Sequence, residues 1–248
     1  SRLFLEIPAA GQQAKVFVNG EFVVSHEGGY SAFRADITEK CTEEFNTIAI
    51  WCSNEKCDAI YPQSADFTFY GGLYRGAHLI CVPETHFELL HYGDLGIHAA
   101  TEPASWDKED FMLHIRTKIC GVEKDNQVIY QIFDEDGKEV ASAARPADSP
   151  DTSIPLYKPH RWDIKNSYQY TLKALIMRNN ECLDEVELKF GVRTFCCDPG
   201  RGFLINGNCV PLRGVSRHQD KLYQGNALTK EDHIRDAELI EEIGANTV

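Results

Sequence analysis

The first part of the chain consists of short runs in which apolar residues occupy alternate positions, a pattern typical of half-buried antiparallel strands. Leu3, Leu5 and Ile7 form the first of these runs. A later run ends at Asn19-Gly20, a dipeptide suited to the positive φ angles of a tight hairpin turn. Further strands are predicted at 47–52 and 74–82. The pattern therefore predicts β-sheet structure throughout this part.

From Phe87 to about Arg193 the alternation continues in longer strands. Apolar residues share one face of a strand at 111–119 and of another at 128–132, which turns at Asp136-Gly137. A segment rich in Pro, Asp and Ser follows and is interpreted as a long surface loop at 144–159. Two more strands are predicted at 168–177 and 185–192. About seven strands in about a hundred residues is the size expected of an immunoglobulin-like sandwich.

The pattern changes after Gly200, where a short apolar strand at 212–215 and a polar loop precede a helix. The helix is predicted at 229–243 from apolar residues spaced three apart, with Thr229 as its cap and Asp232 in the position of a capping-box acid. Gly244 is its expected stop. A second strand begins after it. This arrangement predicts one β-loop-α unit of a parallel α/β fold, and we expect the chain to be cut off at that second strand.

The composition narrows the classes of protein that the chain could represent. Its 248 residues suggest one to three domains, and no apolar run approaches the roughly 20 residues of a membrane-spanning helix. Lys and Arg number 25 against 38 Asp and Glu, a formal net charge of −13. Because phosphate binding needs a clustered basic surface, this excess of acid argues against nucleic acid or an anionic membrane as the partner.

The nine cysteines show no spacing typical of a zinc site or a disulfide framework. Mostly unpaired thiols, together with the absence of an N-x-S/T sequon, favour a reducing cytoplasm over secretion. We therefore expect a cytoplasmic protein.

Two motifs carry a resemblance to family 2 glycoside hydrolases of the β-galactosidase type. The stretch 202–220 contains L-R-G-V-S-R-H-Q-D and resembles the family's L-R-G-V-N-R-H-E at the end of the first barrel strand, with Ser216 in the place of Asn. The upstream stretch 66–75, D-F-T-F-Y-G-G-L-Y-R, resembles the end of the family's jelly-roll domain. The two motifs occur in the same order as in the family, with a block of immunoglobulin-like length between them.

The resemblance implies a mainly β fold in three parts. Residues 1–86 are expected to form a jelly-roll sugar-binding domain that is incomplete at its N-terminus. Residues 87–196 are expected to form an immunoglobulin-like β-sandwich. Residues 197–248 are expected to form the truncated β-loop-α start of a TIM barrel. The family's acid/base and nucleophile, both glutamates, are expected beyond Val248, so no catalytic residue is assigned within the chain.

The resemblance also implies five substrate-binding residues. His218 matches a histidine that donates a hydrogen bond to a galactosyl hydroxyl, and it lies at the C-terminal face of the barrel, where such barrels place their active sites. Asp66 matches an aspartate that lies near the sugar's C6 hydroxyl and a bound sodium ion. Arg217 is a candidate for orienting a catalytic carboxylate, whereas Arg213 could equally belong to the barrel floor. Asp220 is expected to hydrogen-bond either His218 or the substrate.

The sequence therefore predicts part of a retaining enzyme that hydrolyses terminal β-galactosides. Alternatives are a β-glucuronidase- or β-mannosidase-type relative and, in another class, a non-catalytic carbohydrate-binding or scaffold module. The expected partners are a β-galactoside and the remainder of the catalytic barrel, and a homo-oligomer is compatible with the sequence. No cofactor is expected within the chain, while the resemblance allows for Mg²⁺ and Na⁺ in the complete enzyme. The 248 residues alone are expected to be inactive.

Overall fold

The computed structural model describes residues 1–248, which form two compact units, each with its own sheets and core. The first unit contains 1–82, 89–94 and 214–248, and the second contains 83–88 and 95–213. The fold is mainly β up to the C-terminal helix, which confirms the predicted fold class. The division into domains at residues 86 and 196 stays a prediction.

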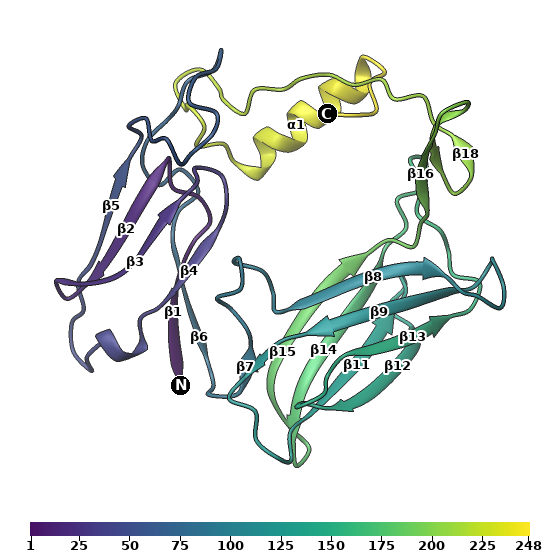
Figure 1. Ribbon diagram of the computed structural model, residues 1–248, viewed down its shortest axis with the longest axis horizontal. Helices are drawn as coiled ribbons and strands as arrows, with labels where there is room; N and C mark the ends of the chain where they lie inside the picture. Colours follow the sequence, from purple (N-terminus) through teal and green to yellow (C-terminus); the bar gives the residue numbers. More distant parts are fainter. The chain divides into compact units, whose positions relative to one another are not determined.

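Two antiparallel three-stranded sheets form the β part of the first unit (Figure 1). The first has the order β4-β1-β6, with β1 (Arg2–Ile7), β4 (Phe33–Asp36) and β6 (His78–Val82). The second has the order β3-β2-β5, with β2 (Gln13–Val18), β3 (Glu21–Glu27) and β5 (Ile48–Ser53). A 3₁₀ turn, Thr38–Lys40, follows β4. The predicted hairpin turn is confirmed, because Asn19 and Gly20 both have positive φ, at 51° and 83°.

The core of this unit lies between the two sheets and contains apolar residues of both. Ile7 on β1 and Val16 and Val18 on β2 are fully buried in it. At the edge of the core, the largely buried guanidinium of Arg34 forms an ion pair with Glu6 at 2.8 Å. Arg34 also donates hydrogen bonds to the backbone oxygens of Leu89 and Asp94, so it ties the segment 89–94 to β4.

The second unit contains a four-stranded and a three-stranded antiparallel sheet, with orders β12-β11-β14-β15 and β13-β9-β8 (Figure 1). Four strands against three is the arrangement of a constant-type immunoglobulin sandwich. The strands are β8 (Ile97–Pro103), β9 (Phe111–Thr117), β11 (Gln127–Phe133), β12 (Glu139–Pro146), β13 (Thr152–Leu156), β14 (Tyr170–Arg178) and β15 (Glu181–Phe190). Shorter pieces are β7 (His86–Phe87) with β10 (Ile119–Cys120), and β16 (Phe195–Asp198), β17 (Gly202–Ile205) and β18 (Asn208–Cys209).

Tyr130 is the largest fully buried side chain of this sandwich, and its polar end is satisfied internally. Its hydroxyl lies 2.7 Å from Thr117 Oγ1 and donates to the backbone oxygen of Pro150 at 2.9 Å. Burial raises the pKa of Tyr130 to about 12, since the ionised phenolate would lose its hydration. The hydroxyl therefore stays protonated over the physiological range.

One loop prediction and two strand predictions in this β region were wrong in detail. The predicted loop 144–159 instead contains the end of β12 and all of β13. Ile154 and Leu156 are buried on alternate positions of β13, and Pro155 is tolerated there because β13 is an edge strand. The strand predicted at 74–82 begins only at His78, after Gly76 with φ 76°. The run 111–119 is interrupted at Lys118, whose N–H binds the backbone oxygen of Gly96.

The C-terminal segment contains α1 (Lys230–Glu242) at the predicted position. The capping box of Thr229 and Asp232 is present, and Gly244 ends the helix with φ 82°. The strand predicted at 212–215 was wrong in extent, because it is reduced to a single parallel bridge between Gly214 and Thr247. Next to this bridge, the Val215 N–H donates to the backbone oxygen of Thr247 at 3.0 Å. The helices of the structure are too short or too polar to span a membrane.

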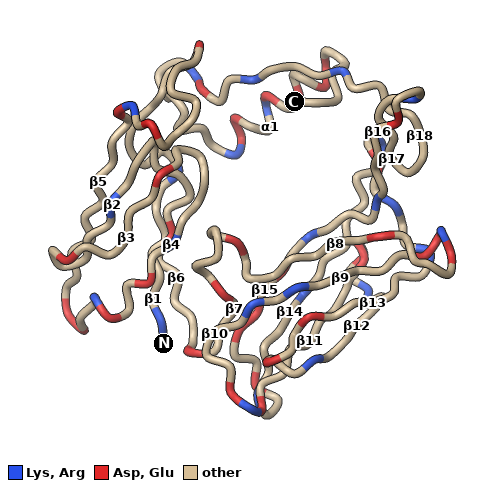
Figure 2. Tube along the Cα trace, in the orientation of Figure 1, with Lys and Arg blue, Asp and Glu red and all other residues tan.

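All nine cysteines are free thiols. Acidic residues are distributed over both units, with basic residues between them (Figure 2). The negative charge of the chain is therefore spread rather than gathered in one segment.

Candidate functional site

A cavity of about 310 Å³ lies within the first unit. This volume is at the lower end of the range for small-molecule sites. Four stretches of chain line it: the residues before β2, the turn after β3, the segment between β5 and β6, and the loop before α1. The lining residues are Gly11, Gln12, Gly29, Tyr30, Asp66, Phe67, Thr68, Tyr70, Tyr74, Arg75, Arg217, His218, Gln219, Asp220 and Asn226.

Four of the five substrate-binding residues predicted from the sequence line this cavity. Asp66 lies on the segment between β5 and β6, while Arg217, His218 and Asp220 lie on the loop before α1. The fold thus brings together residues about 150 positions apart in the chain. Arg213 belongs to the second unit and does not line the cavity.

Aromatic rings form one wall beside His218. The rings of Phe67 and His218 meet edge to face, with centroids 5.9 Å apart and an interplanar angle of 86°. Phe69 packs behind Phe67 at 5.1 Å and does not line the cavity. Tyr70, from the same run, also lines the cavity. Ring faces and edges of this kind offer apolar contact to the C–H groups of a ligand.

Arg217 is held by a carboxylate within the chain. Its Nε donates to Asp236 Oδ2 of α1 at 2.7 Å, and its Nη2 donates to the same oxygen. The Arg217 side chain is only 16% exposed. Asp236 is therefore the partner of Arg217 within the chain, and the role of Arg217 in orienting a catalytic carboxylate stays a prediction. Arg217 therefore anchors the backbone next to His218 to the helix.

The loop between Asp220 and α1 is closed by its own hydrogen bonds. Lys221 and Gly225 exchange backbone hydrogen bonds of 3.0 and 2.9 Å. The Tyr70 hydroxyl donates to Asp220 Oδ2 at 3.3 Å. A Cβ at Gly225 would lie 2.8 Å from the ring of Tyr70, so only glycine allows this close approach. Asp220 is thereby positioned by an aromatic residue of the distant 66–75 segment.

Asp232 connects this loop to the helix. Its carboxylate accepts hydrogen bonds from Lys221 Nζ and, at 3.3 Å, from Gln224 Nε2, in addition to its bonds with Thr229. The Lys221 ammonium, followed by the Thr229 N–H, lowers the pKa of Asp232 well below its usual value. The carboxylate therefore stays ionised and keeps the loop on the helix at any ordinary pH.

Further residues that line the cavity were not among the predicted site residues. The Tyr74 hydroxyl donates to the backbone oxygen of Gly29, and burial raises the pKa of Tyr74. Arg75 lies over the ring of Tyr74 at 5.3 Å and donates to Gln219 Oε1 at 3.3 Å. The family motif itself contains Tyr74 and Arg75. No sequence motif marked Gln12, Gly29 or Tyr30. A polar residue before a strand and a turn that contains glycine are common in any β protein.

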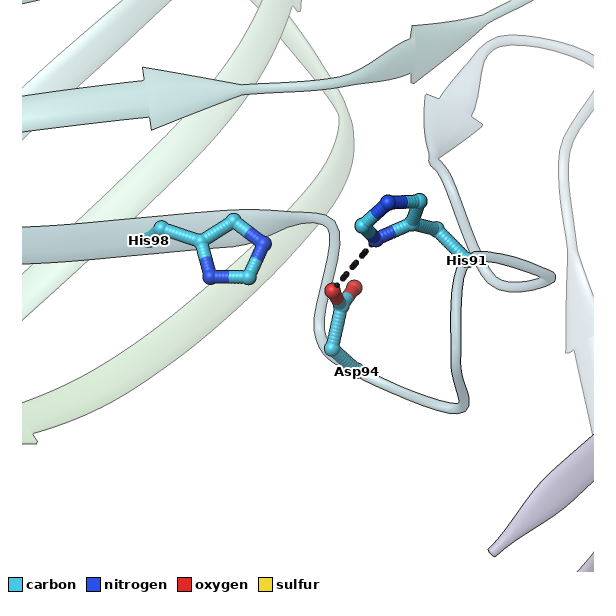
Figure 3. A group of neighbouring side chains, drawn as sticks. All are labelled: His91, Asp94 and His98. Carbon is cyan, nitrogen blue, oxygen red and sulfur yellow. Dashed lines mark hydrogen bonds and ion pairs between the residues drawn. The ribbon is translucent and has the colours of Figure 1, made fainter.

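The site combines hydrogen-bond acceptors, donors and apolar rings around a small volume. Carboxylates are supplied by Asp66 and Asp220, donors by His218 and Arg75, and aromatic contact by Phe67 and other rings. Such a mixture suits a small polyhydroxylated ligand that needs both hydrogen bonds and contact with its C–H faces. Elsewhere in the unit, His91 Nδ1 and the Asp94 carboxylate lie 2.8 Å apart (Figure 3), in a contact that belongs to the 89–94 segment and not to the cavity.

The chain matches two sequence profiles of one family. The profile described as glycosyl hydrolases family 2 matches residues 102–193, and the one described as glycosyl hydrolases family 2, TIM barrel domain, matches residues 199–248. Together the two profiles match more than half of the chain.

Known proteins of this family align with nearly the whole chain. It is 31% identical to a β-glucuronidase of Bacteroides fragilis, over 100% of this chain and 37% of that protein. It is 30% identical to a β-galactosidase of Thermoanaerobacter pseudethanolicus, over 95% of this chain and 32% of that protein. The crystal structure of an FMN-binding β-glucuronidase from Faecalibacterium prausnitzii L2-6 superimposes with a TM-score of 0.95 at 48% identity, covering 99% of this chain and 38% of that one.

The chain thus spans less than two fifths of the length of each of these proteins. The two sequence motifs, the two sandwich-like units and both family profiles all point to the same family. The chain therefore belongs to glycosyl hydrolase family 2.

Proposed function

We propose that this chain supplies the sugar-recognition part of a retaining glycoside hydrolase. The observation that carries the proposal is the convergence of Asp66, His218 and Asp220 on one cavity, from segments that lie far apart in a chain of this family. Hydrogen bonds to sugar hydroxyls that strengthen in the transition state contribute several kcal/mol to this type of catalysis. Recognition residues are therefore part of the catalytic machinery even where they perform no proton transfer.

In the proposed reaction, one carboxylate attacks the anomeric carbon and a carboxylic acid protonates the leaving oxygen. The two groups of a retaining enzyme lie about 5 to 5.5 Å apart. We place both on later strands of the barrel, outside these 248 residues, and assign none of the cavity residues to either role. His218 and Asp66 then act on the glycone by orienting it and by bonding its hydroxyls.

β-Glucuronides are the first candidate substrates. The proposal is supported by the F. prausnitzii relative, at 48% identity, and by the B. fragilis relative, both of which are β-glucuronidases. The sequence interpretation favoured β-galactosides instead. They remain the second candidate, supported by the β-galactosidase of T. pseudethanolicus at 30% identity.

The test is a side-by-side assay of the full-length protein with 4-nitrophenyl β-D-glucuronide and 4-nitrophenyl β-D-galactoside. We expect the glucuronide to have the higher kcat/KM, and NMR of the first product to show the β-anomer. Asp66→Asn and His218→Ala should lower turnover, whereas His114→Ala, on β9 of the second unit, should not. A faster reaction with the galactoside would establish the second candidate, and sugar binding without turnover of either substrate would favour a non-catalytic module.

We also propose Asp66 as a contact for a sodium ion. Carboxylate oxygens are suitable ligands for hard cations, and Asp66 places one in the cavity. Replacing Na⁺ by K⁺ at constant ionic strength should raise KM in the wild-type enzyme and have no effect in Asp66→Asn. Equal KM values in both salts would refute this contact.

A further inference from the structure

Gln12 differs from the other polar residues of the cavity because it is nearly completely buried. It is 7% exposed, and it lies immediately before β2. Its backbone is fixed on both sides: the N–H donates to Ser53 at 2.7 Å, and the carbonyl oxygen accepts from Gly28 at 2.9 Å. The side chain therefore starts from a rigid point of the sheet.

The carboxamide of Gln12 lies against the glycine turn after β3. A Cβ built on Gly29 would meet Gln12 Nε2, Cδ and Oε1 at 3.1 to 3.2 Å, so the amide group packs on the face of Gly29. Both residues line the cavity. Neither the side-chain oxygen nor the side-chain nitrogen of Gln12 has a hydrogen-bond partner in the chain, and the residue borders the cavity.

Because the chain supplies no partner, the hydrogen bonds of this amide must come from the contents of the cavity, either water or a ligand. The one fully buried side-chain polar atom without a partner is Asn126 Nδ2, which lies in the second unit and does not line this cavity. Gln12, by contrast, borders a cavity of a size suited to a small ligand.

We propose that Gln12 is a glycone-binding residue that bonds two neighbouring ring hydroxyls of the sugar. A primary amide has one acceptor oxygen and one donor nitrogen side by side. A sugar carboxylate offers only acceptors and would leave Oε1 unpaired, whereas two adjacent hydroxyls satisfy both atoms. The assignment of the ligand as a sugar rests on the proposed function.

A first experiment measures stability without ligand. Gln12→Met keeps an unbranched side chain and removes the amide, and Gln13→Met is the matched control, since Gln13 is the next residue along and does not line the cavity. Because the amide has no partner, the melting temperature of Gln12→Met should equal or exceed that of the wild type. A clearly lower melting temperature than that of Gln13→Met would show a structural role and overturn the inference.

A second experiment compares monodeoxy substrates in the full-length enzyme. With the parent β-glucuronide, Gln12→Met should lower kcat/KM about 10- to 100-fold and Gln13→Met should not. Any pair of neighbouring ring hydroxyls on C2, C3 and C4 includes the one on C3. For each substrate we compare the wild-type kcat/KM with that of Gln12→Met. The ratio should fall toward one for the 3-deoxy substrate. It should also fall toward one for either the 2-deoxy or the 4-deoxy substrate, but not for both. A ratio that is the same for all three would overturn the inference.

The inference and the proposed function can fail separately. If the wild type turns over no β-glycoside, the proposed function fails, and thermal stabilisation by methyl β-D-glucuronide then decides the role of Gln12. Stabilisation of the wild type and of Gln13→Met but not of Gln12→Met would support sugar binding by Gln12. If the glycoside stabilises all three proteins equally, or none of them, the inference is overturned.

Discussion

The ion pair between Arg217 and Asp236 is the contact whose removal should most directly loosen the loop that carries His218. Helix α1 buries none of its residues, so its position depends on a few polar contacts. A helix of 13 residues is marginal on its own in water. Arg217→Gln removes the charge and one of the two converging hydrogen bonds, while leaving much of the side-chain stem in place.

The magnitude follows from the exposure of the two side chains. A hydrogen bond to a charged group contributes about 1.5 to 3 kcal/mol when it is shielded from water. The Arg217 side chain is 16% exposed but that of Asp236 is 40% exposed, so solvent screening reduces the value. We expect a coupling free energy of about 1 to 2 kcal/mol between the two residues, which corresponds to roughly 5- to 30-fold in a local opening equilibrium.

Native-state hydrogen exchange of the α1 amides measures this opening. Arg217→Gln and Asp236→Asn should each accelerate exchange of residues 230–242, and the double variant should exchange little faster than either single variant. Arg235→Gln is the matched control, because Arg235 contacts only the exposed Glu238, three residues away, at 3.5 Å. Strictly additive effects in the double variant would show that Arg217 is not held by Asp236 and would refute this account of the loop.

Three further predictions concern the site and the two units. His218→Ala should lower kcat/KM for the preferred aryl glycoside about 10²- to 10³-fold in the full-length enzyme, and an unchanged value would make His218 structural only. Thr229→Ala should destabilise α1 by about 1 kcal/mol through loss of its cap, measured by the same amide exchange, while Thr247→Ala serves as a comparison outside the helix. Because the pKa of Tyr130 is raised to about 12, its contribution is complete below the unfolded-state pKa near 10. The unfolding free energy of the second unit should therefore fall as pH rises from 10 toward 12, and Tyr130→Phe should abolish that part of the slope in denaturant titrations.

The sequence was sufficient to predict an element where one residue or a short pattern determines the backbone conformation. Asn19 and Gly20 both have positive φ angles, which Asn and Gly adopt more readily than other residues, so the dipeptide alone predicts the turn. Thr229 and Asp232 form a capping box because the bonds that define it lie within four consecutive residues. These elements were predicted at their observed positions since they need no information from distant parts of the chain.

Predictions failed where a distant partner decides the outcome. The segment 144–159 has the composition of a loop, yet part of it forms β13, because β9 offers a strand edge and the core accepts Ile154 and Leu156. The segment 212–215 shows the reverse: its apolar residues do not form a full strand, because its pairing with the segment after α1 is limited to one bridge between Gly214 and Thr247. Strand formation depends on pairing and burial, which composition does not contain.

In the candidate site, too, some residues were predictable from local motifs and others depended on contacts between distant segments. The motifs around Asp66 and His218 were sufficient to identify the family and four residues of the cavity. The tertiary structure alone decided that Arg217 pairs with Asp236, that Tyr70 binds Asp220, and that Gln12 lies buried and unpartnered beside them. These contacts join segments separated by many residues. They exist only because the two sheets and α1 pack as they do, and no local pattern in the sequence records that packing.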